Sequence, residues 1–198
     1  MNNRLTKFLI ALLMVAITGL TQAQDPHFSH FYANPLYLNP ALAGSALSPR
    51  LTLNYRNQWP SLDANFVTYG ASYDQYLPDI NSGVGVSLMT DRAGQGVLVS
   101  AGISALYSYR LKINRDMFVN FGAKASFFQG RLDWNSLVFG DQFDPIRGMV
   151  FETEETPPSS TSKSIVDFSI GAVYTYKDIF FGGVAVDHLT QPSNGFYD

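Results

Sequence analysis

The sequence predicts an all-β protein, a transmembrane up-and-down antiparallel β-barrel, on three observations. Apolar and polar residues alternate along several long segments, as they do in strands whose successive side chains point to opposite faces. Charged residues make up only 15% of the chain, against about a quarter in soluble domains. Aromatic residues reach 14% and gather near the ends of the predicted strands, where membrane barrels carry aromatic girdles.

The first 23 residues are interpreted as a signal peptide for export. Arg4 and Lys7 form its positive region, residues 8–20 form a short apolar stretch, and Thr21 and Ala23 are the small residues before the cleavage site. The apolar stretch is shorter than the roughly 20 residues of a spanning helix, which disfavours an anchor that stays attached. Residues 24–49 are then an N-terminal segment expected in the periplasm, and residues 50–198 form the barrel.

Alternation is clearest in residues 97–113, where every odd position is apolar or aromatic and most even positions are small or polar. The same pattern predicts strands at 51–59, 67–74, 83–88, 117–127 and 166–176, and less clearly at 179–189. About seven strands are therefore expected. A soluble β-sandwich also alternates. The length of the strands and their Gly- and Ser-rich polar faces favour a barrel whose apolar faces meet lipid.

The connections differ in length in a regular way. The turns at 114–116 and 177–178 follow even-numbered strands and are tight, whereas the connection 133–163 follows an odd-numbered strand and is long. This parity is expected when short turns face the periplasm and long loops face the outside. The long connection is acidic, without the spacing of an EF-hand, so a solvated loop that contacts a partner is favoured over a calcium site. Its carboxylates are Asp133, Asp141, Asp144, Glu152, Glu154 and Glu155.

Other chemistries find little support. A net charge of −3 offers no basic face for nucleic acid, and the absence of cysteine excludes disulfides and thiolate chemistry. His27 and His30 have the spacing of a metal pair but no third ligand at a supporting distance in sequence. The segment 94–96 is predicted to be a turn and not a phosphate loop. No catalytic residue, metal or cofactor is expected, and the protein is predicted not to be an enzyme.

Several charged residues occupy the polar faces of the predicted strands. An Arg or Lys that faces lipid at mid-membrane costs about 2–4 kcal/mol, so these charged residues are expected to face the lumen. We expect these residues to pair with one another for structural reasons. They are Arg56, Arg110, Lys112, Lys124, Asp74 and Asp167.

Five blocks of residues resemble a known family: 24–32, the Asn-Pro-rich run 34–44, Tyr-Arg-Asn-Gln-Trp-Pro at 55–60, the strand at 69–73, and Gly-Val-Gly-Val at 83–86. With these blocks the chain resembles the PorP/SprF family of outer-membrane proteins, which is associated with type IX secretion and gliding motility in Bacteroidota. The resemblance implies a non-enzymatic outer-membrane barrel. Such a barrel binds or anchors a secreted cell-surface protein and contacts periplasmic machinery.

Aromatic and basic residues of the first and third of these blocks are the candidate partner-binding residues. They are His27, Phe28, His30, Phe31, Tyr32, Tyr55, Arg56 and Trp59. The alternative function is a general porin or solute channel, which would use the same Gly- and Ser-rich lumen for diffusion.

Seven strands do not suit a barrel made by one chain, because bacterial single-chain barrels close with an even number. The last residues, 195–198, also lie outside any strand pattern. We therefore expect the chain to be the N-terminal part of a larger barrel, incomplete at its C-terminus. A barrel assembled from several copies is the alternative.

Overall fold

The computed structural model describes residues 31–62, 65–144, 146, 148–177, 179–192 and 195–196. The predicted signal peptide and the candidate residues His27, Phe28 and His30 lie outside these ranges.

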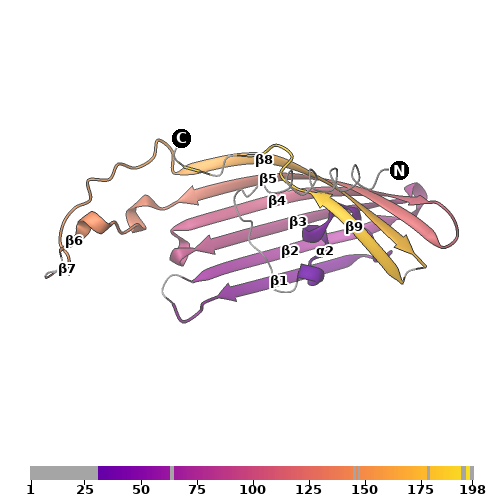
Figure 1. Cartoon of the computed structure of the whole chain (residues 1–198), viewed down its shortest axis with the longest axis horizontal. Helices are drawn as coiled ribbons and strands as arrows, with labels where there is room; N and C mark the ends of the chain where they lie inside the picture. The colour runs from indigo at the N-terminus through magenta and orange to yellow at the C-terminus, as the bar shows by residue number, and fades with distance from the viewer. Residues whose placement is uncertain are drawn as a thin grey trace, which may run out of the picture.

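The described chain forms a seven-stranded antiparallel sheet that curls into a half-barrel (Figure 1). Each strand is hydrogen-bonded to its neighbours in sequence order, so the predicted all-β class and up-and-down topology are confirmed. β1 and β9 are the edge strands. The strands of the sheet are β1 (Arg50–Gln58), β2 (Phe66–Leu77), β3 (Ser82–Ala93), β4 (Leu98–Lys112), β5 (Met117–Leu132), β8 (Ser162–Tyr176) and β9 (Phe180–Val186).

Short elements join these strands. The hairpin β6 (Phe143–Asp144) and β7 (Gly148–Met149) forms a separate two-stranded sheet in the long connection between β5 and β8. The helical elements are η1 (Phe31–Ala33), α2 (Pro35–Leu38), η2 (Pro40–Leu42), η3 (Pro78–Ile80), η4 (Gly94–Gly96), η5 (Trp134–Ser136) and η6 (Gly140–Gln142). Among the described residues, no helix has the length and apolar character needed to cross a membrane.

Four strands extend beyond the alternating segments that predicted them, and one of these is β2, which continues to Leu77. β3 continues to Ala93 because Asp91 and Arg92 stay paired with β2 and β4, and the Asp91 carboxylate accepts a hydrogen bond from the Thr68 hydroxyl. β5 likewise continues to Leu132 along β4, and β8 begins at Ser162. Polar residues interrupt the alternation here, but the ladder of backbone hydrogen bonds continues because the neighbouring strands are long.

The outer face of the half-barrel is apolar. Side chains of this face include Leu53, 72% exposed, Leu88, 51% exposed, and Ile103, 49% exposed, and aromatic residues such as Tyr107 and Phe121 accompany them. A continuous surface of this kind requires apolar surroundings. Phe128 is also an aromatic residue near the end of a predicted strand, but it does not join an outer aromatic band as such residues were expected to do. It lies on the inner face, where its ring packs over Gly102.

The inner face is small and polar. Among the described residues of the strands, Leu106 and Val173 are its buried apolar side chains, and Leu106 packs with Leu36 and Ala43 of the chain before β1. Polar residues dominate the rest, and they are Thr68, Ser72, Asp74, Ser82, Ser108, Asn120, Ser126, Asp167 and Ser169. Burial of so many polar groups is tolerated because most of them find hydrogen-bond partners. Three of them, Asp74, Ser108 and Asn120, bond to a segment that precedes β1.

Candidate functional site: a chain segment inside the half-barrel

Residues 34–44, here called the inner segment, lie against the inner face of the sheet (Figure 1). Their local structure follows from two Asn-Pro pairs. Proline disfavours helix in the residue before it and suits the first helical position, so α2 begins at Pro35 and η2 begins at Pro40. Asn39 between them is extended, with φ −159° and ψ 126°, and its side-chain oxygen accepts a hydrogen bond from the Ala41 amide. Two short turns therefore follow one another, too compact to be a strand.

Asn39 joins the inner segment to β8 and β9. Its amide nitrogen donates to the carbonyl of Val184 at 3.0 Å and to that of Ala172 at 3.4 Å. These carbonyls belong to neighbouring strands, so a single side chain connects the segment with both of them.

Ala41 and Ala43 are held by β5 and β4. The side-chain amide of Asn120 donates to the Ala41 carbonyl at 3.3 Å, and the Ser108 hydroxyl donates to the Ala43 carbonyl at 2.6 Å. Both alanines are almost completely buried, with exposed fractions of 0% and 2%. The small side chains allow the backbone of the inner segment to approach the sheet closely.

Glycines on the sheet provide the matching space. An ideal Cβ on Gly122 would lie 2.2 Å from the Ala41 nitrogen, and one on Gly83 would lie 2.1 Å from the Ala43 carbonyl oxygen. A Cβ on Gly171 would lie 2.1 Å from the side-chain oxygen of Asn39. No other residue fits at these positions with the segment in place. These three glycines on the polar face of the strands therefore allow the inner segment to contact the sheet.

Asp74 connects the end of the inner segment with β1. Its carboxylate, 1% exposed, accepts a hydrogen bond from the Gly44 amide at 2.7 Å and forms a two-pronged ion pair with Arg50, both contacts at 2.9 Å. Arg50 also donates to the Leu42 carbonyl at 3.2 Å. Removal of one partner from such a buried pair is costly, because it leaves an uncompensated charge. Pairing of Asp74 was expected from the sequence. Its partner Arg50 was not predicted, because Arg50 precedes the predicted strand.

The remaining charged residues of the inner face are also engaged. Lys124 pairs with Asp187 at 2.7 Å, and Asp167 lies 2.8 Å from the His188 ring nitrogen. Lys124, Asp167 and His188 line a cavity of about 40 Å³ beside the inner segment, which has room for a few waters only. Asp74, Lys124 and Asp167 are therefore paired, but with Arg50, Asp187 and His188 and not with one another as expected.

Arg56, Arg110 and Lys112 have neutral neighbours instead. Arg56 donates to the side chain of Gln58. The Arg110 guanidinium lies 4.1 Å from the centre of the Phe118 ring, and the Lys112 ammonium lies 6.0 Å from it. In the described part of the chain, no group of three or more His, Asp or Glu side chains is arranged to hold a metal ion.

The candidate partner-binding residues that the structure describes do not form one cluster. Tyr55 and Trp59 point to the outside, 62% and 54% exposed, and their rings contact Tyr69 and Phe66. Arg56 lies on the inner face. Tyr32, in η1, is 68% exposed, and Phe31 begins the same element. Tyr55 lies on the apolar outer face and Trp59 is exposed just beyond the end of β1, whereas Tyr32 belongs to the chain that leads into the inner segment.

Comparison with protein families gives one result that covers most of the chain. A family model described as "Type IX secretion system membrane protein PorP/SprF" matches residues 20–198, including the inner segment and all strands of the sheet. Comparison with curated proteins and with solved structures gave no match.

Proposed function

Because this chain belongs to the PorP/SprF family of type IX secretion system membrane proteins, we propose that it binds or anchors a secreted cell-surface protein in the outer membrane and contacts periplasmic machinery. The protein is a non-enzymatic membrane component of this secretion system. The proposal adds three points to the family membership. The protein lies in the outer membrane, residues 1–23 direct its export, and its partners are a secreted cell-surface protein and periplasmic machinery.

The filled interior is the observation that carries the proposal. A general porin needs an open polar lumen. Here the inner segment is hydrogen-bonded to β2, β4, β5, β8 and β9, and three glycines leave space for its backbone and for the Asn39 side chain. An interior occupied in this way suits a protein that presents surfaces to partners better than one that conducts solutes.

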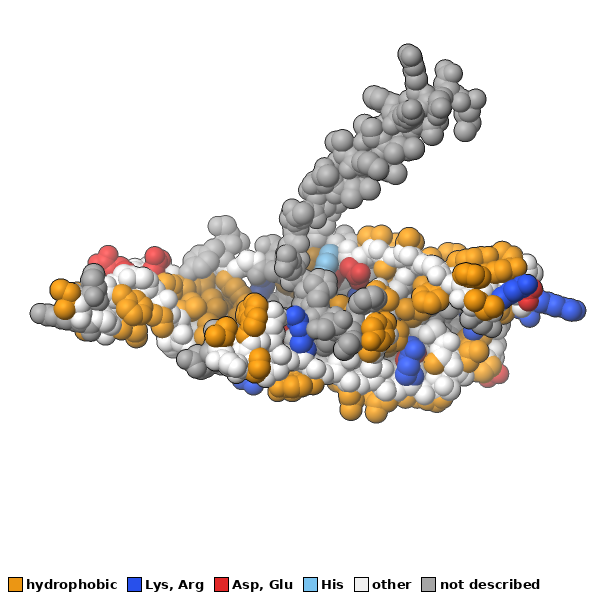
Figure 2. Space-filling model, turned by 60° about the horizontal axis from the view of Figure 1, so that its bottom comes forward, with side chains coloured by type: hydrophobic (Ala, Val, Ile, Leu, Met, Phe, Trp, Pro, Cys, Tyr) orange, Lys and Arg blue, Asp and Glu red, His pale blue; other side chains and the backbone are white. Residues whose placement is uncertain are grey.

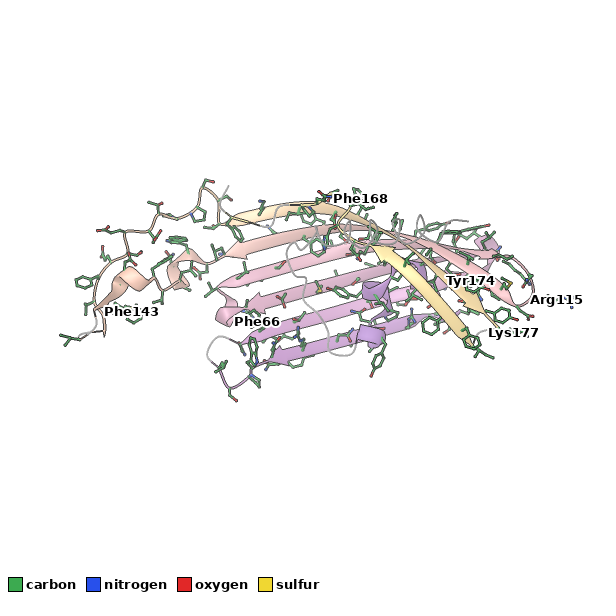
Figure 3. The ribbon with its side chains drawn as sticks, in the orientation of Figure 1. Phe66, Arg115, Phe143, Phe168, Tyr174 and Lys177 are labelled. Carbon is green, nitrogen blue, oxygen red and sulfur yellow. The ribbon has the colours of Figure 1, made fainter. Side chains whose placement is uncertain are left out.

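The two ends of the sheet differ in a way that suits two kinds of partner. Figure 3 shows Arg115 and Lys177 at the end with the short turns and Phe143 in the long connection at the opposite end. If short turns face the periplasm, the short-turn end meets periplasmic machinery and the long connection faces the cell surface. The candidate residues His27, Phe28, His30, Phe31 and Tyr32 immediately precede the inner segment in the sequence.

Co-purification tests the proposal. The tagged full chain is cross-linked in intact cells and purified, and its companions are compared with those of an unrelated porin that carries the same tag. We expect a secreted surface protein and periplasmic secretion components to be enriched. A chain lacking residues 24–33 keeps the inner segment and should lose the periplasmic components while still entering the membrane. Absence of any enrichment with the intact chain contradicts the proposal.

Planar-bilayer recording separates the proposal from the solute-channel alternative. The purified chain should give no steady open-channel current under conditions in which the control porin conducts. A steady ohmic current, together with a lack of enriched partners, favours the channel.

A further inference from the structure

The connection between β5 and β8, residues 133–161, is an organised structure beyond the ends of the strands (Figure 1). At its base, the Leu132 amide donates to the Thr161 carbonyl at 2.8 Å. The rings of Trp134 and Phe139 lie 4.9 Å apart, and β6 pairs with β7. The sequence predicts a solvated loop here. It does not indicate the pairing within the connection.

Asp141 holds the two halves of the connection together. Its carboxylate accepts hydrogen bonds from the Thr153 hydroxyl at 2.9 Å and from the Glu154 amide at 2.8 Å. The Gln142 carbonyl accepts a further bond from the Val150 amide at 3.1 Å. These contacts restrict the hairpin, so its exposed side chains are presented in a defined arrangement.

Large apolar side chains are exposed on this hairpin, and we call them the loop patch. Phe143 and Met149 are partners across the hairpin and therefore share a face, with exposed fractions of 54% and 58%. Val150 and Phe151 follow directly, 52% and 56% exposed. Burial of one such side chain contributes about 1.5–3 kcal/mol. A protein that orders a hairpin yet leaves these groups uncovered has a surface suited to binding.

The charge around the loop patch decides which occupant fits. Residues 133–161 contain six carboxylates and one arginine, a formal charge of −6 + 1 = −5. Figure 2 shows acidic and apolar side chains close together at this end of the molecule. An anionic lipid surface is repelled by such charge, and a second copy of the hairpin carries the same charge. A basic protein segment is attracted.

We propose that the loop patch binds a segment of another protein that presents apolar side chains flanked by Lys or Arg. This inference rests on the proposed function and identifies where on the chain the secreted surface protein is held. Phe143, Met149 and Phe151 enter the apolar part of the partner, and the surrounding carboxylates pair with its basic residues.

Site-specific photo-cross-linking tests the position and chemistry of the contact. A photoreactive phenylalanine analogue replaces Met149 in the full chain in living cells, and the cross-linked peptide is identified by mass spectrometry. The matched control places the analogue at Leu62, which is also 58% exposed but lies in the connection between β1 and β2. We expect Met149 to cross-link an apolar segment with adjacent Lys or Arg in the secreted protein that co-purifies. Cross-links to lipid, to a second copy, or to no protein overturn the inference.

A binding measurement then uses that identified protein as the probe. We expect the double variant Phe143→Ser, Phe151→Ser to bind at least tenfold more weakly than the unmodified chain, and Leu62→Ser to bind as the unmodified chain does. Unchanged affinity of the double variant overturns the inference but leaves the proposed function intact if the secreted protein still co-purifies. If the unmodified chain enriches no secreted protein, the proposed function itself fails.

Discussion

Single residues on the inner face are constrained by a segment far away in the sequence. Gly122 lies in the middle of a strand, where glycine is normally unfavourable. Its position is explained by the Ala41 backbone, which occupies the space of a side chain. Asn39 and Asp74 are similarly explained by contacts across the interior, and neither would stand out in its own strand or turn.

Replacement of Gly122 tests the importance of this contact. Gly122→Ala places a methyl group 2.2 Å from the Ala41 nitrogen, and we expect a loss of about 1–3 kcal/mol in unfolding free energy, the usual range for overpacking. The matched control is Gly182→Ala in β9, where an added Cβ meets nothing within 4 Å. Urea unfolding of the detergent-refolded protein, followed by tryptophan fluorescence, measures both variants. Equal effects of the two substitutions would show that the inner segment does not pack as described.

At the scale of elements, the long connection has an order of its own that depends on one carboxylate. The amide of Glu154, foremost, and the hydroxyl of Thr153 lower the pKa of Asp141 below its ordinary value of 3.8. A lowered pKa in the folded state means that the ionised form is the one stabilised. The hydrogen bonds of Asp141 therefore stabilise the connection above pH 3.8 and are lost as the pH falls through the lowered value.

The lowered pKa of Asp141 predicts that the connection between β5 and β8 loses its ordered structure at low pH while the sheet stays folded. Hydrogen exchange of peptides from residues 139–155, corrected for the intrinsic pH dependence, should be slow at pH 6 and faster below the ordinary pKa of 3.8. Peptides from β4 should show no such change. Asp141→Asn removes the titrating group, so its exchange should no longer respond to pH in this window. The explanation is wrong if the variant retains the same response.

At the scale of the whole molecule, the two faces of the sheet differ in polarity, and this difference determines the surroundings that each face requires. The outer face presents exposed apolar side chains along the strands, while the inner face is covered by the inner segment and bound through polar groups. The membrane thus provides the apolar surroundings for the outer face, and the chain itself provides the contents of the interior.

A charge placed at mid-strand on the outer face tests this arrangement. Leu88 lies at the middle of β3. We expect Leu88→Arg to make the free energy of folding into vesicles less favourable by about 2–4 kcal/mol, the cost of Arg at the bilayer midplane. The matched control Leu62→Arg changes a residue of similar exposure, 58% against 51%, in a connection outside the strands. The folded fraction is measured by heat-dependent mobility in electrophoresis. Equal folding of both variants would contradict contact of this face with lipid.

The sequence alone determined the features that depend on one segment at a time. Alternation in 97–113 places Ile103 on one face and Ser104 on the other, because this geometry is a property of any single strand. The two Asn-Pro pairs similarly determine the turns of the inner segment. The PorP/SprF resemblance was also readable in the residues and is confirmed by the family match.

Only the tertiary structure decided which distant residues meet. The pairing of Lys124 with Asp187 and the approach of Ala41 to Gly122 depend on the register and curvature of all the strands together. No local pattern encodes these contacts, because a shift of one strand by a residue would exchange its faces while leaving its own alternation unchanged.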